Sequence, residues 1–238
     1  MKKTLLAFAV LATLVPSLAL AEAGDIVVRL RATHISPDES SKLSSETEAS
    51  VPGGSNLLYG AGNNAHLVVD SNTIPEIDFS YYITKNIAAE LILAVGTRHD
   101  VKIEGLGVGG VATKADLGSV NLLPPTLTLQ WHFNPDQTFD PYLGAGLSYV
   151  RAMDRSLNST LAGGQNLPIK ISRNSWGPAI QAGFDYNLEN KWLINFDVKK
   201  IWFDTKVEGS LDNGATYVKI DNLDVDPWVV SVGFGRKF

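Results

Sequence analysis

The chain has 238 residues, a formal net charge of −5, 21 glycines and no cysteine. An acidic chain without a basic cluster excludes nucleic acid as an expected partner. The absence of cysteine excludes disulfides as a source of stability.

The first predicted element is a secretory signal peptide at residues 1–21. Lys2 and Lys3 precede an apolar stretch, which ends in the small-residue pattern Ala19-Leu20-Ala21 that is typical of a cleavage site. Removing the two lysines takes the formal net charge from −5 to −7. We therefore expect one mature domain, residues 22–238, and no later segment has the roughly 18 consecutive apolar residues of a membrane helix.

The mature chain is dominated by a period of two, which predicts β-strands. At residues 126–133, for example, Leu127, Leu129 and Trp131 alternate with the polar residues Thr128 and Gln130. Eight segments follow this pattern, at residues 26–33, 76–81, 87–95, 126–133, 143–149, 176–186, 192–199 and 228–238. Most of them approach the roughly 9–11 residues that a tilted strand needs to cross a bilayer.

The connections between these strands alternate in length. Short turns are predicted at residues 84–86, 134–140 and 187–191, and long loops at residues 37–72, 97–118, 151–174 and 206–224. Short turns at one end and long loops at the other are typical of outer-membrane barrels. A soluble barrel has no physical reason to keep this asymmetry.

Large aromatic residues on the apolar face also gather at two heights. Beside the short turns and the C-terminus are Tyr81, Trp131, Phe133, Tyr186, Trp192 and Phe238, and beside the long loops are Tyr149, Trp176 and Trp228. These positions match the aromatic girdles at the two membrane interfaces. The sequence thus predicts an all-β fold, an eight-stranded antiparallel transmembrane β-barrel with long extracellular loops and short periplasmic turns. The closed sheet gives every backbone group a partner in lipid.

The opposite face of the strands is small or polar and should line the lumen. We expect a polar network of Arg29, Arg31, Asp78, Glu90, Gln130, Asp185 and Asp197. Unpaired charges there would be costly, so the two arginines should pair with Asp78 or with residues of the last strand. Eight strands leave room only for side chains or one small ligand, which argues against a wide water-filled pore.

Several short motifs of the sequence resemble those of the outer-membrane protein W (OmpW) family. The most specific are LPPTL, PYLGAG, SWG and DPWV, and the similarity covers the predicted strands but matches the long first loop poorly. The resemblance implies the outer membrane of a Gram-negative bacterium and passive passage of small, mostly hydrophobic molecules, as in relatives implicated in alkane uptake. It also implies that Phe238 is read by the barrel-assembly machinery, although Arg236 stands where relatives usually have an aromatic residue. The partners that the resemblance implies are outer-membrane lipid and lipopolysaccharide. We expect the protein to be a monomer.

The family also suggests where solutes leave the barrel. A proline cannot donate to a strand ladder, and the family's proline region, matched here by Pro124 and Pro125, is thought to open sideways. In family members, inward apolar residues on the third and seventh strands close the lumen. Ile92 matches the position on the third strand. Lys199 occupies the position on the seventh strand, where some members have an aromatic residue. This departure puts an apolar gate in doubt. Leu122 and Leu123, beside the prolines, are further candidates for an apolar entrance.

Other functions receive less support from the sequence. Gly105-Leu106-Gly107-Val108-Gly109-Gly110 fits the dinucleotide pattern G-x-G-x-x-G, but it lies in a predicted loop and follows no βαβ unit. The four histidines have no metal-ligand spacing, and no nucleophile elbow is present. We therefore expect no cofactor, no metal and no catalysis. Two alternatives stay open: a narrow channel for small polar solutes, and a structural or adhesive barrel that acts through its loops.

Overall fold

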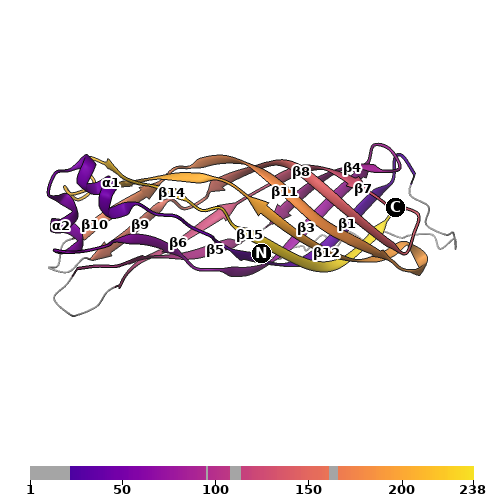
Figure 1. Cartoon of the computed structure of the whole chain (residues 1–238), viewed down its shortest axis with the longest axis horizontal. Helices are drawn as coiled ribbons and strands as arrows, with labels where there is room; N and C mark the ends of the chain where they lie inside the picture. Colours follow the sequence, from indigo (N-terminus) through magenta and orange to yellow (C-terminus); the bar gives the residue numbers. More distant parts are fainter. Residues whose placement is uncertain (1–21, 95, 108–113, 161–165) are drawn as a thin grey trace, which may run out of the picture.

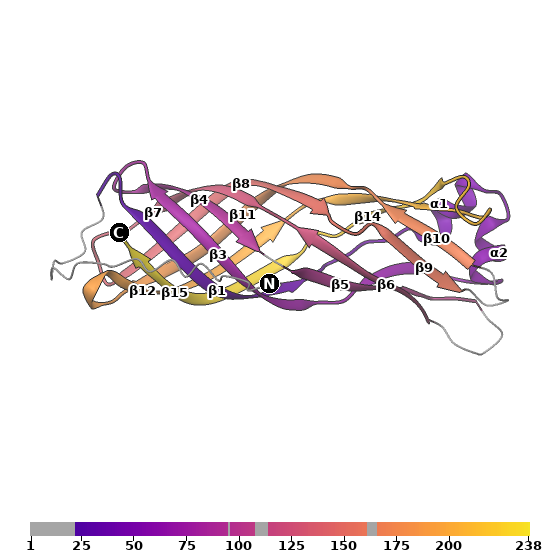
Figure 2. The same cartoon turned by 180° about the vertical axis from the view of Figure 1, so that it is seen from behind.

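The structure is a computed structural model that describes residues 22–94, 96–107, 114–160 and 166–238. The predicted signal peptide, Val95 of the third predicted strand and part of the glycine-rich segment lie outside these residues. Two views of the chain show a long cylinder of tilted strands, with the C-terminus near one end and two helices at the other (Figures 1 and 2).

Eight strands of the described chain form a closed antiparallel barrel. In barrel order they are β1 (Ile26–Ser36), β3 (Asn72–Tyr82), β4 (Ile87–Ala94), β7 (Thr126–His132), β8 (Phe139–Ala152), β11 (Asn174–Asn187), β12 (Trp192–Ile201) and β15 (Trp228–Lys237). The barrel closes because β15 pairs with both β12 and β1, from Val27 opposite Lys237 to Ser36 opposite Trp228. This confirms the predicted fold and the place of all eight predicted strands.

The barrel strands are bounded differently from the predictions at several ends. β3 begins at Asn72 and β8 at Phe139, so each is longer than the alternating pattern suggested. β7 ends at His132, one residue before the predicted end. The last short turn contains a 3₁₀ turn, η1 (Glu189–Lys191), in which Asn190 has φ 59°.

The four long connections are not irregular loops. They fold into helices and strands that lengthen the barrel at one end, and we call this part the extension. It consists of helices α1 (Leu43–Ser50) and α2 (Gly54–Tyr59) and of strands β2 (His66–Val69), β5 (Thr97–Glu104), β6 (Lys114–Leu123), β9 (Ser156–Thr160), β10 (Asn166–Ile171), β13 (Asp204–Gly209) and β14 (Val218–Asp224). Strands β6, β5 and β2 continue the barrel sheet, while β14, β13, β10 and β9 form a separate four-stranded sheet. Of the helices in the described residues, none is long and apolar enough to cross a membrane.

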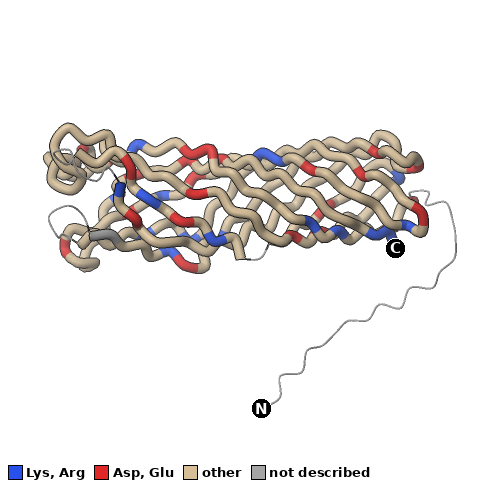
Figure 3. Tube along the Cα trace, turned by 90° about the horizontal axis from the view of Figure 1, so that it is seen from below, with Lys and Arg blue, Asp and Glu red and all other residues tan. Residues whose placement is uncertain are grey.

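The alternation of polar and apolar residues is reversed in the extension relative to the barrel. In β7 of the barrel, Thr128 and Gln130 are buried inside, and Leu129 and Trp131 are exposed on the outer wall. In β5 of the extension, Val101 and Ile103 are buried inside and Asp100 is exposed. The barrel wall therefore suits lipid, and the extension wall suits water with an apolar interior. Figure 3 shows basic and acidic residues along the whole length of the barrel and of the extension.

The outer wall of the barrel carries the predicted aromatic residues at its two ends. Trp131 and Trp192 are exposed near the short turns, and Trp176 and Trp228 near the extension. The rings of Tyr149 and Trp176 lie 4.5 Å apart between centroids. These positions agree with two interfacial belts on the lipid face.

Phe238 follows directly after the last strand, β15, and still pairs with β1 in the closing seam. Its backbone N–H donates to the carbonyl oxygen of Ile26 at 2.8 Å, while its ring is exposed on the outer wall. The guanidinium of Arg236 lies over the rings of Trp192 and Phe238, at 5.4 and 5.6 Å from their centroids. Arg236 therefore contributes to the aromatic belt instead of breaking it.

Deletion of Phe238 is expected to lower the amount of folded barrel in the outer membrane. The deletion removes an exposed aromatic residue and the two backbone hydrogen bonds that Phe238 exchanges with Ile26 at the end of the seam. The measurement is the fraction of folded protein in isolated outer membranes, with Phe238→Tyr as the control that keeps an aromatic ring. Wild-type membrane levels of the deletion variant would contradict a role in assembly.

Candidate functional site

The lumen contains two layers of opposite chemistry, a polar floor in the barrel and an apolar cavity above it. The floor is formed by inward side chains of the barrel strands. Arg29 of β1 lies at its centre, and its side chain is completely buried.

Arg29 links β1 to three other strands, β3, β4 and β11, through its planar guanidinium. It donates to both carboxylate oxygens of Asp185, with Nε–Oδ1 3.1 Å and Nη2–Oδ2 2.5 Å. Its Nη1 donates to Ser80 Oγ at 2.6 Å and lies 3.4 Å from Asp78 Oδ1 and 3.5 Å from Glu90 Oε1. Such a two-pronged pair fixes orientation as well as charge.

Arg31, two residues further along β1, joins the next level of the floor. Its Nε donates to Glu76 Oε1 at 2.7 Å and lies 2.8 Å from Asp78 Oδ2. Its Nη1 donates to Asn195 Oδ1 at 3.1 Å. Of the two predicted alternatives, pairing with Asp78 or with residues of the last strand, the structure shows the pairs of both arginines with Asp78.

Two amides and a tyrosine complete the network from the opposite wall. Gln130 and Gln181 both donate to Glu90 Oε2 at 2.8 Å. The Tyr142 hydroxyl donates to Asp197 Oδ2 at 2.9 Å. Because the floor is buried and cross-linked from all sides, it obstructs an axial path through the barrel.

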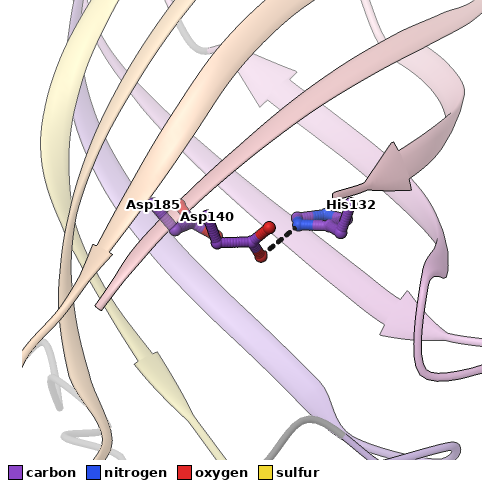
Figure 4. A group of neighbouring side chains, drawn as sticks. All are labelled: His132, Asp140 and Asp185. Atoms are coloured by element: carbon purple, nitrogen blue, oxygen red, sulfur yellow. Dashed lines mark hydrogen bonds and ion pairs between the residues drawn. The ribbon is translucent and has the colours of Figure 1, made fainter. Parts of the chain in front are cut away.

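His132 of β7, Asp140 of β8 and Asp185 of β11 form a small cluster beside the floor (Figure 4). His132 Nδ1 lies 2.7 Å from Asp140 Oδ2, and one ligand atom of each residue lies within 4.8 Å of the others. Both oxygens of Asp185, however, accept hydrogen bonds from Arg29. A metal ion would have to compete with that guanidinium, so the donor set fits a structural hydrogen-bond cluster better than a metal site. The spacing of the histidines in the sequence gave no sign of this cluster.

Above the floor lies an apolar cavity with about 660 Å³ of atom-free space, part of it open to solvent. Its apolar lining is drawn from the barrel rim and the extension and comprises Ile35, Pro37, Val69, Ile92, Ala94, Leu122, Pro124, Val150, Ile201, Phe203, Val225, Pro227 and Val229. A second apolar cavity of about 610 Å³ shares Val69, Leu122, Val150, Phe203 and Val225 with it. Because they share these residues, the two cavities adjoin, and together they give the extension an apolar interior above the floor.

The wall beside the cavity has a gap in its strand ladder. The pairs between β4 and β7 end at Ile92 opposite Thr126, and those between β5 and β6 begin at Thr97 opposite Leu122. Between them, no ladder pair in the described residues joins β4 to Pro124 or Pro125. On the other side, the N–H of Tyr149 donates to the carbonyl of Pro125 at 2.9 Å, so the prolines stay attached to β8.

Comparison with known proteins agrees with this architecture. The sequence profile of the OmpW family matches residues 22–238. The chain belongs to the OmpW family.

Relatives of this OmpW-family barrel cover most of its length. Outer membrane protein W of Vibrio cholerae is 31% identical over 245 residues and covers 100% of both chains. Outer membrane protein AlkL of Ectopseudomonas oleovorans is 30% identical over 183 residues, covering 77% of this chain and 74% of AlkL. The dibenzothiophene metabolism operon protein PahQ of Pseudomonas aeruginosa is 26% identical over 218 residues, covering 92% of this chain and 90% of PahQ.

A solved structure of the same kind is similar over nearly the whole chain. The crystal structure of the outer membrane protein OprG from Pseudomonas aeruginosa matches with a TM-score of 0.71 and 31% identity, covering 91% of this chain and 97% of OprG. The protein is therefore an outer-membrane barrel of the OmpW family.

The structure places the sequence-predicted residues of this OmpW-family barrel in three settings. The predicted network residues Arg29, Arg31, Asp78, Glu90, Gln130, Asp185 and Asp197 are all buried in the floor. Four predicted gate residues, Ile92, Leu122, Pro124 and Lys199, line the apolar cavity. Leu123 is exposed on the outer wall, and Pro125 does not line the cavity.

Sequence reasoning missed much of the cavity and part of the floor. Gln181 and Glu76 have the same inward parity as their neighbours Asp185 and Asp78, so parity could have found them. Val69, Phe203 and Val225 lie in or beside extension strands that the sequence assigned to loops. No signal in the barrel strands could have placed those three side chains above the lumen.

Proposed function

We propose that this outer-membrane barrel mediates passive uptake of small hydrophobic molecules. The observation that carries the proposal is the apolar cavity that rests on a cross-linked polar floor. An apolar solute entering through the extension gains by leaving water in such a cavity.

The proposed exit is sideways, through the wall at Pro124 and Pro125. The floor would have to open its buried ion pairs to pass a solute along the axis, and that is costly. The gap between β4 and the prolines lies at the height of the cavity, and Ile92 and Pro124 line the cavity beside it. A solute that leaves through the wall enters apolar membrane lipid, whereas a solute that leaves along the barrel axis would enter the aqueous periplasm.

The relatives support an apolar solute. PahQ is named for an operon of dibenzothiophene metabolism, and dibenzothiophene is a fused aromatic molecule with little polarity. A narrow channel for polar solutes would need a continuous polar path, whereas most of the cavity lining above the floor is apolar. Planar-bilayer recording is expected to show little steady ion conductance, and a stable open channel would favour the polar alternative.

Replacing both prolines with valine is expected to reduce uptake of a hydrophobic fluorescent probe to the level of cells without the barrel. Valine supplies the missing backbone N–H and favours the extended conformation, so the ladder can close across the gap. Uptake is measured as the initial rate of probe accumulation in intact cells that express equal amounts of folded protein.

The matched control is Pro178→Val. Pro178 is also a proline of a barrel strand, but it lies in β11, on the other side of β8 from the gap, and it does not line the cavity. This variant should take up the probe at the wild-type rate. Wild-type uptake by the Pro124→Val/Pro125→Val variant would exclude the lateral route while leaving the apolar cavity as the entry site.

A further inference from the structure

One side chain at the base of the apolar cavity has hydrogen-bonding capacity that the fold does not use. Lys199 of β12 is nearly completely buried and lines the cavity, and its Nζ makes no hydrogen bond. An ammonium group carries three donors. Its nearest acidic atom, Asp197 Oδ1, lies at 3.2 Å and is likewise without a hydrogen bond.

The other polar side chains that line the cavity among the described residues are occupied. Glu76 accepts from Arg31 at 2.7 Å, and the ring of His99 pairs through Nδ1 with the carbonyl oxygen of Asp70 at 2.8 Å. The hydroxyl of Thr126 donates to Ser148 Oγ at 2.9 Å, and that of Thr97 donates to the carbonyl of Leu122. Lys199 thus differs from the rest of the lining in offering donors to whatever occupies the cavity.

The charges around Lys199 select the kind of acceptor. Asp197 already balances the ammonium charge, and the nearby carboxylate of Glu76 is paired with Arg31. A carboxylate ligand would add a further negative charge to a floor that contains Asp78, Glu90 and Asp197. A neutral oxygen accepts a hydrogen bond from Lys199 without adding charge.

We propose that the cavity prefers apolar molecules that carry one neutral oxygen acceptor, such as a ketone, and that Lys199 donates to that oxygen. The inference rests on the proposed uptake function and names its substrate class. The hydrocarbon part of the ligand would fill the apolar lining, with the oxygen pointing down toward the floor. A hydrogen bond to a buried charged donor is expected to raise affinity for the ketone roughly tenfold over a hydrocarbon of the same shape.

The test uses 2-acetylnaphthalene and 2-ethylnaphthalene, which match closely in shape and differ in the carbonyl oxygen. Binding to the purified full-length barrel in detergent micelles is measured by equilibrium dialysis, with binding to protein-free micelles subtracted. The wild type should bind the ketone about tenfold more tightly than the hydrocarbon. Lys199→Met should bind both equally, and Lys199→Arg, which keeps the donors, should retain the preference.

The control variant is Lys200→Met. Lys200 is the neighbouring buried lysine, but its Nζ donates to Asp38 Oδ2 at 2.9 Å and to the carbonyl of Asp226 at 2.6 Å, and it does not line the cavity. This variant should keep the ketone preference. Equal binding of both probes by the wild type, or an unchanged preference in Lys199→Met, would overturn the inference but not the proposed uptake. Binding of neither probe by folded wild-type protein would overturn both.

Discussion

Replacing Arg29 with methionine is expected to destabilise the barrel by about 3–5 kcal/mol, because it removes one side of a buried ion-pair network. Methionine can fill the space of the aliphatic stem but cannot donate to Asp185, Ser80 or Glu90. The carboxylate of Asp185 would lose both of its bonds to the guanidinium in a place that water does not reach.

The measurement is the midpoint of urea unfolding of the purified barrel in lipid vesicles, followed by tryptophan fluorescence. A change in midpoint without a change in the slope m reports a change in stability. Arg29→Lys should recover part of the loss, because lysine restores the charge but not the two-pronged geometry.

Arg98→Met is the matched control for this experiment. Arg98 is an exposed arginine of β5 in the extension, and exposed substitutions away from structural features usually change stability by no more than about 0.5 kcal/mol. If Arg29→Met unfolded at the same urea concentration as Arg98→Met, the network around Arg29 would contribute little to the stability of the barrel.

The barrel was predictable from the sequence because each strand must turn one face to lipid and one to the lumen. Leu129 and Trp131 on the outside of β7, and Gln130 on the inside, follow directly from parity. Parity also placed Arg29 and Asp78 in the lumen, where they pair. Ladder closure then follows, since a strand edge in lipid would leave backbone groups without partners.

The extension was not predictable in the same way. β9 has a single buried apolar residue, Leu157, so its sequence does not differ from a polar loop. β5 does alternate, but with the apolar residues Val101 and Ile103 inside, the reverse of the barrel strands. These strands are stabilised by one another across four separate connections, and such long-range pairing leaves little local signal.

The candidate site combines a predictable and an unpredictable part for the same reason. The floor residues lie on barrel strands of known parity, whereas the cavity above them depends on the way in which the extension closes over the lumen. The ladder gap at Pro124 and Pro125 could be suspected from the missing N–H groups. Its position beside the cavity depends on strand tilt and stagger, which parity does not determine.

Replacing Val150 with tryptophan is expected to reduce hydrophobic uptake to the level of cells without the barrel. Val150 lies on β8, is buried, and lines both apolar cavities, so it stands where they meet. The larger indole can extend into the atom-free space of the cavity instead of forcing the wall apart. The fold should therefore be retained while the space where the two cavities meet is filled.

The matched control is Leu147→Trp on the same strand. Leu147 is exposed on the lipid-facing wall, where an additional indole meets only membrane and leaves the cavity unchanged. With equal amounts of folded protein in the outer membrane, Leu147→Trp should take up a hydrophobic fluorescent probe at the wild-type rate and Val150→Trp should not. Equal rates for the two variants would show that solutes reach the cell without passing through the cavities, and the transport proposal would then fail at its first step.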